Sequence, residues 1–423
     1  MKISNIKELI TKSHDIMSDI YGKGNEAYQI KRYLNAIDEY INTYNECDDV
    51  IIFSAPGRTE ICGNHTDHNL GKVVAASVNL DVIAVVEKTD DGKITVKSEG
   101  YPIDEMNISD LSIKEEEKNK SISLIRGMTA RFSELGYNIG GFKAYMTSNV
   151  LKGSGLSSSA AFEVMIGTIL NGIYNDNKVS AVEIAKIAQY AENVYFMKPC
   201  GLMDQMASSV GGIITIDFED KKNPVIEKID FDFSGAGYAL CIVDTGGNHA
   251  DLTDEYASIP AEMKAVAGFY SKETLRGLEK SDIINNINIL REKFGDRAVL
   301  RALHFIDENE NVTLLADALK NGDLGEFLRI NKKSGNSSFR YLQNVYANIN
   351  PSEQGISLAV YMAENILRDK GSYRVHGGGF GGTTQNFVPI EMVQDFKKEI
   401  EKVFGEGKCH ILNIRKYGGI RVF

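Results

Sequence analysis

A glycine turn that runs into three consecutive serines, Lys-Gly-Ser-Gly-Leu-Ser-Ser-Ser-Ala-Ala at residues 152–161, could bind phosphate. Glycines let the backbone approach a ligand closely, and serine hydroxyls add hydrogen-bond donors. Apolar residues recur at three- and four-residue steps from Phe162 to Ile173, which predicts a helix whose free N–H groups and positive dipole end face the turn. A serine-rich cap on an ordinary buried helix is the plainer alternative. The predicted phosphate-binding residues are Gly153, Ser154, Gly155, Leu156, Ser157, Ser158, Ser159 and Ala160.

The spacing excludes two familiar loop classes. The chain has no Gly-x-x-x-x-Gly-Lys-Ser/Thr sequence, which a Walker loop requires. It also lacks the Gly-x-Ser-x-Gly sequence of a nucleophile elbow. The phosphate loop must therefore belong to another class.

Two further segments carry polar or conformationally special residues. Residues 54–69 pack Arg58 and many hydrogen-bonding side chains between two predicted strands, which suits recognition of hydroxyl groups, although a solvated turn-rich loop is an alternative. Residues 374–382 match the dinucleotide G-x-G-x-x-G pattern, but a strand-like run at 383–388 follows where that fingerprint needs a helix. These glycines therefore indicate a close approach of backbone to backbone or ligand, with a flexible hinge as the alternative.

Composition narrows the class of protein. The chain has 423 residues with 47 basic and 58 acidic side chains, and the net charge of −11 disfavours nucleic acid and anionic membranes as partners. Its first 20 residues do not resemble a signal peptide and no run of about 18 apolar residues occurs, so we expect a cytoplasmic protein. Five cysteines without C-x-x-C spacing argue against disulfides and structural zinc, and the His65-x-x-His68 pair beside Asp67 lacks a third clustered ligand.

The pattern of elements predicts an α+β protein with two lobes. Residues 1–48 are expected to form an extension of two helices around the break at Gly22 and Gly24. Residues 49–216 mix strands and helices and contain the phosphate loop, and the charged segment 217–222 is the expected boundary to a second domain at 217–423.

The three motifs, taken in this order, resemble the GHMP small-molecule kinases and, within them, the galactokinases. The resemblance runs from about Ile51 to the C-terminus. It also includes Leu124–Gly127, Ala191–Asn193, Gly201–Gln205 and, more weakly, Asp317–Leu324. It implies an N-lobe like domain 2 of ribosomal protein S5 and a ferredoxin-like C-lobe, with ATP and sugar bound between them. It further implies phosphorylation of galactose at its anomeric hydroxyl.

Matching positions imply roles for individual residues. Asp204 corresponds to the family's catalytic aspartate, Arg58 to its partner arginine, and Ser158 with Glu192 to the contacts of Mg²⁺. An aspartate can accept the proton of the attacking hydroxyl, while arginine and magnesium offset charge on the transferred phosphoryl group. The implied sugar-binding residues are Asn64, His65, Asp67, His68, Gly201, Tyr256, Gly378 and Gly379.

The chain departs from the family pattern in its sugar-recognition segment. Asn64 stands where galactokinases carry an acidic residue, and His68 stands where they usually carry tyrosine. A neutral amide still bonds a hydroxyl, and it also removes charge repulsion against a carboxylate at carbon 6 of the sugar. The other departures are Glu60 for asparagine, Leu151 for proline, His376 for threonine, and Ser258 to Pro260 where arginines are common.

We therefore expect an ATP-dependent sugar-1-kinase, with galactose as substrate. A kinase for galacturonate or a related galacto-sugar is one alternative, because of Asn64 and His68. A galactokinase-like sensor that binds sugar and ATP without turnover is another. The expected partners are the sugar and ATP, with neither nucleic acid nor membrane, and protein partners are left open.

Overall fold

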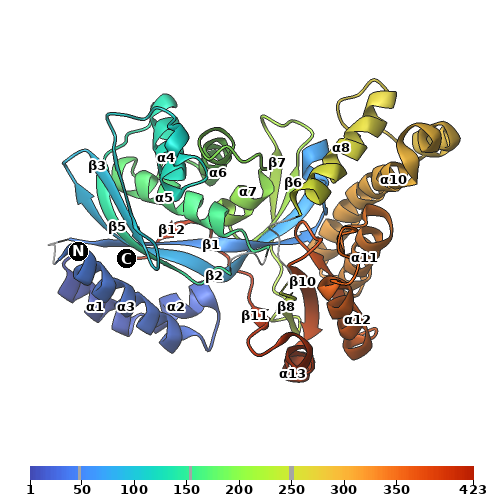
Figure 1. The fold of residues 1–423 in the computed structure, drawn as a ribbon. Coiled ribbons are helices and arrows are strands. Elements are labelled where there is room, and N and C mark those ends of the chain that lie inside the picture. Colours follow the sequence, from blue (N-terminus) through green and yellow to red (C-terminus); the bar gives the residue numbers. More distant parts are fainter. Residues whose placement is uncertain (46–48, 152–154, 247–251) are drawn as a thin grey trace.

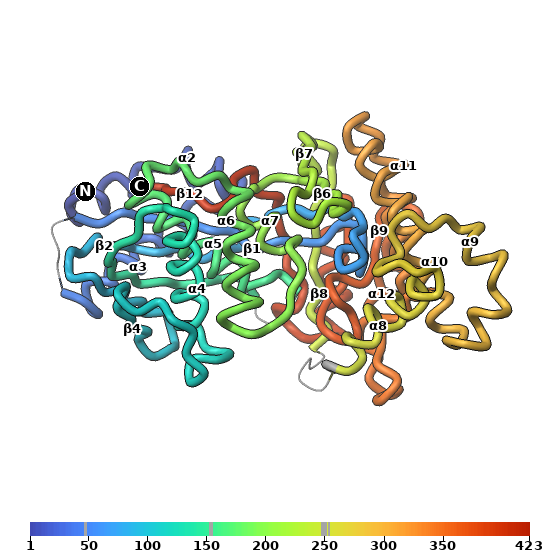
Figure 2. Tube along the Cα trace, turned by 90° about the horizontal axis from the view of Figure 1, so that it is seen from above, coloured from blue at the N-terminus to red at the C-terminus, as the bar shows by residue number. Residues whose placement is uncertain are grey.

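The computed structural model describes residues 1–45, 49–151, 155–246 and 252–423. Its elements form two lobes side by side, with both chain ends on the N-lobe (Figures 1 and 2). Among the described residues, no helix combines the length and apolar character needed to cross a lipid bilayer. Residues 152–154, which include the predicted phosphate-binding residues Gly153 and Ser154, lie outside the described residues.

The N-lobe is built around a twisted sheet that has eight strands within the described residues. Six strands follow the order β12-β1-β2-β5-β3-β4, and β6 and β7 extend it from β2. Neighbours are antiparallel except for β3 and β5, which run parallel. The strands are β1 (Ile51–Cys62), β2 (Lys72–Thr89), β3 (Lys93–Ser98), β4 (Ile103–Asn107), β5 (Gly141–Ser148), β6 (Ile213–Asp217), β7 (Val225–Ile229) and β12 (Ile420–Arg421).

Helices cover both faces of this sheet (Figure 1). Side chains alternate between the faces along each strand, so that Phe53 packs against one helical layer and Ile52 against the other. One layer contains α4 (Ser121–Glu134), α5 (Ser158–Tyr174), α6 (Ala181–Tyr190) and α7 (Met203–Val210). The other is the N-terminal extension, α1 (Ile3–Lys12), α2 (His14–Tyr21) and α3 (Glu26–Tyr44). The extension was expected to have two helices, but Ser13 divides the first of them.

The C-lobe has a sheet with the order β11-β8-β10-β9, four antiparallel strands within the described chain. Its strands are β8 (Tyr238–Asp244), β9 (Ser372–His376), β10 (Thr383–Pro389) and β11 (Cys409–Leu412). Its helices are α8 (Thr253–Phe269), α9 (Lys280–Asn285), α10 (Ile287–Lys320), α11 (Leu324–Ser337), α12 (Gly355–Leu367) and α13 (Val393–Phe404). The strand expected after the glycine run is confirmed as β10. Apolar residues of this lobe, such as Phe327 and Phe387, join the core of the N-lobe.

The lobe boundary lies later in the chain than the charged segment 217–222. Strand β7 still pairs with β6 in the first sheet, and the first strand of the second sheet begins at Tyr238. The charged composition of this segment predicts a linker. In the structure its residues instead end β6 and form the turn that leads to β7. The chain end also returns to the first sheet, where β12 pairs with β1.

A buried carboxylate fastens the extension to the sheet. Asp81 has no exposed surface and accepts hydrogen bonds from Tyr21 at 2.6 Å, Arg32 at 2.5 Å and Arg415 at 2.9 Å, and also from Ser54. Burial alone would raise the pKa of Asp81, but the two guanidinium groups outweigh it and lower the pKa below its usual value. The extension is thus an integral layer of the N-lobe.

We expect Asp81→Asn to destabilise the protein by about 3–5 kcal/mol, because it leaves two buried guanidinium groups without their counter-charge. Urea unfolding monitored by circular dichroism measures this loss. The exposed Asp176→Asn change serves as control and should stay within about 0.5 kcal/mol of the parent. Equal stabilities of the two variants would contradict the anchoring role of Asp81.

Candidate active site

Arg58 and Asp204 form an ion pair between β1 and the first turn of α7. Arg58 Nε and Nη2 lie 2.7 Å and 2.6 Å from Asp204 Oδ1. The other carboxylate oxygen accepts a hydrogen bond from Ser157, and Arg58 also donates to the Gly155 carbonyl. The Asp204 side chain is 33% exposed and the Arg58 side chain 7%, so the carboxylate is held on one side and open on the other. Arg58 lies inside a strand rather than on a loop, because β1 continues to Cys62.

The described part of the phosphate loop contacts this pair through Gly155 and Ser157. Gly155 and Ser157 have positive φ angles of 69° and 55°, and α5 starts at Ser158. Strand β1 supports the turn, because Arg58 N donates to Leu156 O at 3.1 Å. The serines of the first turn of α5 and its free N–H groups can therefore hold an anion. Leu156 and Ala160 are buried and fix the loop to the core.

Two glutamates near the start of α5, Glu163 and Glu192, share the side chain of Gln205 as a hydrogen-bond donor. Gln205 Nε2 donates to Glu192 Oε2 at 2.8 Å and to Glu163 Oε2 at 3.1 Å, and Lys198 Nζ lies 3.1 Å from Glu192 Oε1. Glu192 belongs to a π-helical turn, Ala191–Tyr195, that follows α6. Burial and the nearby Glu192 raise the pKa of Glu163 well above its usual value.

A cavity of about 260 Å³ brings these groups together with the C-lobe. Its lining includes Ser157, Ser158, Ser159, Glu192, Lys198, Asp204, Tyr256, His376, Gly378 and Gly379. A second cavity of about 360 Å³ shares Ser158 and Ser159 with it and is mainly apolar. That lining includes Val82, Tyr101, Leu124, Met146, Phe162 and Phe196. One anion-binding turn thus lies between a polar and an apolar chamber.

The sequence did not point to Lys198, Glu163, Gln205 or the apolar cavity. The apolar lining residues come from two strands, two helices and two separate loop positions, and each taken alone has the character of a core residue. Lys198 follows a residue with positive φ, Met197, which directs the chain after the π-helical turn back to the cavity. No local pattern indicates this reversal.

Three of the sugar-binding residues predicted from the sequence, Tyr256, Gly378 and Gly379, line the same cavity as Asp204, and Asp67 lies near enough to Asp204 to feel its charge. A Cβ at Gly201 would come within 2.0 Å of Asp67 Oδ2, so a side chain there would displace the Asp67 carboxylate. His65 Nε2 lies 2.9 Å from Gly378 O, and Tyr256 Oη donates to Gly379 O at 2.7 Å. His68 is exposed, and its ring lies 5.6 Å from that of His65.

The electrostatics of this region follow from burial. Burial, together with the nearby Asp204, raises the pKa of Asp67 to about 6. Burial also lowers the pKa of His65 to about 4. At neutral pH the pair therefore offers a carboxylate acceptor and a neutral imidazole, whose Nε2–H donates to the Gly378 carbonyl.

Comparison with known proteins gives a consistent result. The family model "GHMP kinases N terminal domain" matches residues 123–212, and the "Galactokinase galactose-binding signature" matches residues 38–88. A galactokinase of Streptomyces coelicolor is 29% identical over 363 residues, which are 84% of this chain and 88% of that protein. The chain is therefore similar to the galactokinases among the GHMP kinases.

Solved structures of low sequence identity share the fold. The crystal structure of Lactococcus lactis galactokinase complexed with galactose has a TM-score of 0.78 at 22% identity, and the match covers 92% of this chain and all of that one. Methanococcus jannaschii mevalonate kinase has a TM-score of 0.60 at 16% identity, covering 86% of this chain and 98% of that one. The two-lobed GHMP kinase fold predicted from the sequence is confirmed.

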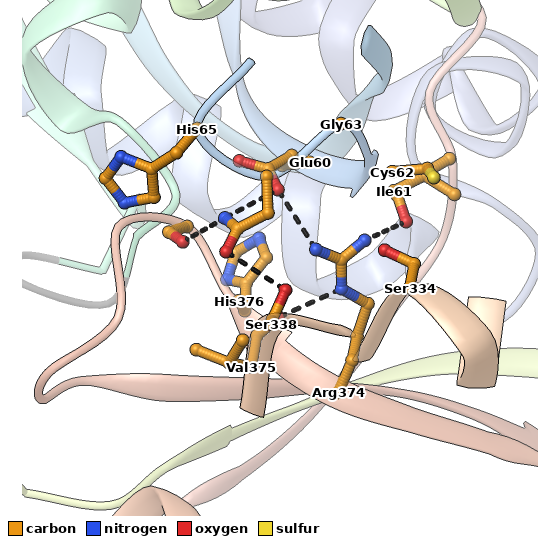
Figure 3. Close-up of polar contacts among 12 residues, drawn as sticks. Glu60, Ile61, Cys62, Gly63, His65, Ser334, Ser338, Arg374, Val375 and His376 are labelled. Atoms are coloured by element: carbon orange, nitrogen blue, oxygen red, sulfur yellow. Dashed lines mark hydrogen bonds and ion pairs between the residues drawn. The ribbon is translucent and has the colours of Figure 1, made fainter. Parts of the chain in front are cut away.

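The structure differs from the sequence-based expectation at Asn64, which was predicted to contact the sugar. The Asn64 side chain has no exposed surface, because Glu60, Gly377 and Asn344 take its hydrogen bonds. Figure 3 shows Arg374 reaching toward Glu60 and the Ile61 carbonyl, with Glu60 between Arg374 and His65. Burial raises the pKa of Glu60 to about 7, although Arg374 and Arg58 act against this rise.

We expect Lys198→Met to raise the affinity of the nucleotide-free kinase for Mn²⁺ by up to about fivefold, since the lysine competes with a cation for Glu192. Electron paramagnetic resonance of free Mn²⁺ measures this affinity. Lys178→Met, at an exposed lysine paired with Asp176, is the matched control and should change nothing. An unchanged or lower affinity in Lys198→Met would show that Lys198 does not oppose cation binding at Glu192.

Proposed function

We propose that this protein transfers the γ-phosphoryl group of ATP to the anomeric hydroxyl of galactose, giving galactose 1-phosphate and ADP. The observation that carries the proposal is the Arg58–Asp204 pair, which borders the same cavity as the serines of α5 and the C-lobe residues Tyr256 and Gly378. A sugar hydroxyl bound at the open side of Asp204 would lie between a proton acceptor and an anion-binding turn. The similarity to galactokinases supports the choice of substrate.

In the proposed reaction, Asp204 accepts the proton of the anomeric hydroxyl as its oxygen attacks the γ-phosphorus. The bond between the sugar oxygen and phosphorus forms, the bond to the β,γ-bridging oxygen breaks, and ADP leaves with that oxygen. Arg58 holds the carboxylate in one orientation through two contacts to Oδ1 and places positive charge beside it. Ser157 supports the same carboxylate from the other oxygen.

The phosphates of ATP would bind at the start of α5, where Ser158 and Ser159 line both cavities. The apolar cavity would then accommodate the base, since its aromatic and aliphatic side chains suit a planar ring. Ser158 and Glu192 would hold Mg²⁺, because a hydroxyl and a carboxylate leave room for phosphate oxygens and water around the ion. When bound, Mg²⁺ neutralises charge on the phosphoryl group. Lys198 adds a second positive charge at the same wall.

The sugar would lie against His65, Asp67 and Tyr256, with the backbone at Gly201, Gly378 and Gly379 close by. Asp67 supplies a carboxylate acceptor, and His65 supplies an imidazole ring, for hydrogen bonds with neighbouring hydroxyls of the sugar. The intact Arg58–Asp204 pair favours catalysis over a sensor without turnover. The cytoplasmic location and the absence of nucleic-acid and membrane partners remain predictions from the sequence.

We expect ADP formation that depends on galactose and magnesium, with phosphorus NMR locating the product phosphate on carbon 1. The assay compares galactose, galacturonic acid, N-acetylgalactosamine, arabinose, 6-deoxygalactose and glucose. Asp204→Asn should lower kcat by about 10²–10⁴ while the thermal unfolding midpoint hardly changes. Selective turnover of another sugar would overturn the substrate. A near-normal rate in Asp204→Asn would overturn the assignment of the base.

The pH dependence should identify Asp67. Because its pKa is raised to about 6, the carboxylate gains a proton as the pH falls through 6 and loses its capacity as a charged acceptor. We therefore expect kcat/KM for galactose to fall as the pH drops below 6. This acidic limb of the pH profile should be absent in Asp67→Asn, whose overall rate is lower. Persistence of the same limb in Asp67→Asn would assign it to another group.

A further inference from the structure

The Asn64 side chain has used all of its hydrogen-bonding capacity within the protein. Its Nδ2 group donates to Gly377 O at 2.7 Å and to Glu60 Oε1 at 2.9 Å. Its Oδ1 atom accepts from Asn344 Nδ2 at 2.7 Å and from Ser338 Oγ at 3.3 Å. An amide side chain has two N–H donors and two acceptor lone pairs, so no position is left for a substrate group. The side chain is also fully buried.

The backbone of Asn64 is held just as firmly by helix α10 of the C-lobe. His304 Nε2 lies 3.0 Å from Asn64 O. The backbone N–H groups of Gly63 and Asn64 both point to Glu308 Oε1, at 3.0 Å and 3.3 Å. Burial alone would raise the pKa of Glu308, but His304, Arg374 and its hydrogen-bond donors lower it to about 2, so it accepts these bonds as an anion. Rotation of Asn64 toward a ligand would break contacts on both sides of the residue.

What Asn64 does touch is the glycine loop, residues 377–379, that lines the active-site cavity. Its amide holds the carbonyl of Gly377, and through Asn344 it supports the group that donates to Gly378 O at 3.1 Å. The next two carbonyls of the loop accept from His65 and Tyr256. Because Gly378 and Gly379 line the cavity, a shift of this loop would change the sugar-binding wall.

Glu60 explains why residue 64 is neutral. Glu60 is 4% exposed, pairs with Arg374 at 3.2 Å and accepts the Asn64 amide at the same oxygen. A carboxylate at position 64 would present two acceptor oxygens to the Glu60 carboxylate and the Gly377 carbonyl in a buried place, where repulsion is weakly screened. The neutral side chain therefore follows from its protein surroundings, and a carboxylate on the substrate is not needed to account for it.

We propose that Asn64 is a positioning residue that couples Glu60 to the glycine loop, and that it does not select the substituent at carbon 6 of the sugar. This inference rests on the proposed function for its kinetic consequence. Its structural part, the dependence of residue 64 on Glu60, is independent of activity.

The test uses the isosteric variant Asn64→Asp, alone and combined with Glu60→Gln. Alone, it removes two donated hydrogen bonds and adds a buried charge, so we expect kcat/KM for galactose to fall at least about tenfold and the unfolding midpoint to drop. The ratio of kcat/KM for galactose to that for 6-deoxygalactose should stay the same, and galacturonic acid should gain nothing. In the double variant, the amide introduced at position 60 can donate to the carboxylate introduced at position 64, and the total charge with Arg374 is that of the parent. The double variant should therefore recover part of the kcat/KM for galactose and part of the unfolding midpoint that Asn64→Asp loses.

A matched control comes from the same loop. Asn69 is 3% exposed and contacts Met263, His68 and Leu275 N, and within the described residues no carboxylate is in hydrogen-bond contact with it. Asn69→Asp therefore also adds a buried charge, but Glu60→Gln should not relieve its loss. A second readout is pH: the deficit in unfolding midpoint of Asn64→Asp relative to the parent should shrink from pH 8 to pH 5.5, because two close carboxylates come to share a proton.

Two results would overturn the inference. One is a changed preference between galactose and a sugar altered at carbon 6 in Asn64→Asp. The other is an unfolding midpoint that Glu60→Gln fails to restore, or restores equally in Asn69→Asp. If Asn64→Asp yields no folded protein, recovery of folded protein in the double variant is the rescue. If the parent phosphorylates no sugar, the proposed function fails while the unfolding measurements still decide the role of Asn64.

Discussion

The site depends on the hydrogen bonds by which the C-lobe holds the end of strand β1. Gln385 binds Thr59 Oγ1 and Glu60 O, Arg374 and Asn331 bind Ile61 O, and Glu308 binds the N–H groups of Gly63 and Asn64. The same strand carries Arg58, whose guanidinium fixes Asp204 from the other side. Since buried polar groups without partners are costly, these contacts determine where strand β1 ends and how residues 63–69 leave it.

Burial gives similar side chains different tasks. Asp81 is an anion because two arginines surround it, and it serves the fold. Burial close to Glu192 raises the pKa of Glu163, and of the two glutamates it is Glu192 that lines the cavity. Asp204 is partly open and paired with one arginine, which suits a group that must take and release a proton. The overall net charge of −11 describes none of these differences.

Much of the site could be predicted from local sequence, because its groups are close in the chain or lie in specific motifs. The serine turn at the start of α5 and the strand after the glycine run have local signals in glycines, hydroxyls and apolar spacing. Lys198, Gln205 and the apolar cavity have none, because their neighbours come from elements distant in sequence. The charged segment 217–222 predicts a lobe boundary that is too early in the chain. It belongs to the hairpin of β6 and β7, and an exposed hairpin turn can be as rich in charged residues as a linker.

The sequence by itself determined the resemblance to galactokinases, the two-lobed fold and the pairing of Asp204 with Arg58, since these depend on residue types at specific positions. Only the tertiary structure decided what Asn64 does. From the sequence it is a polar residue beside His65 and Asp67 and belongs with them as a ligand of the sugar. In the folded protein its amide lies between Glu60, Gly377 and Asn344, from strand β1 and two C-lobe segments. Hydrogen-bonding capacity is finite, and whether any remains for a substrate depends on neighbours that only folding brings together.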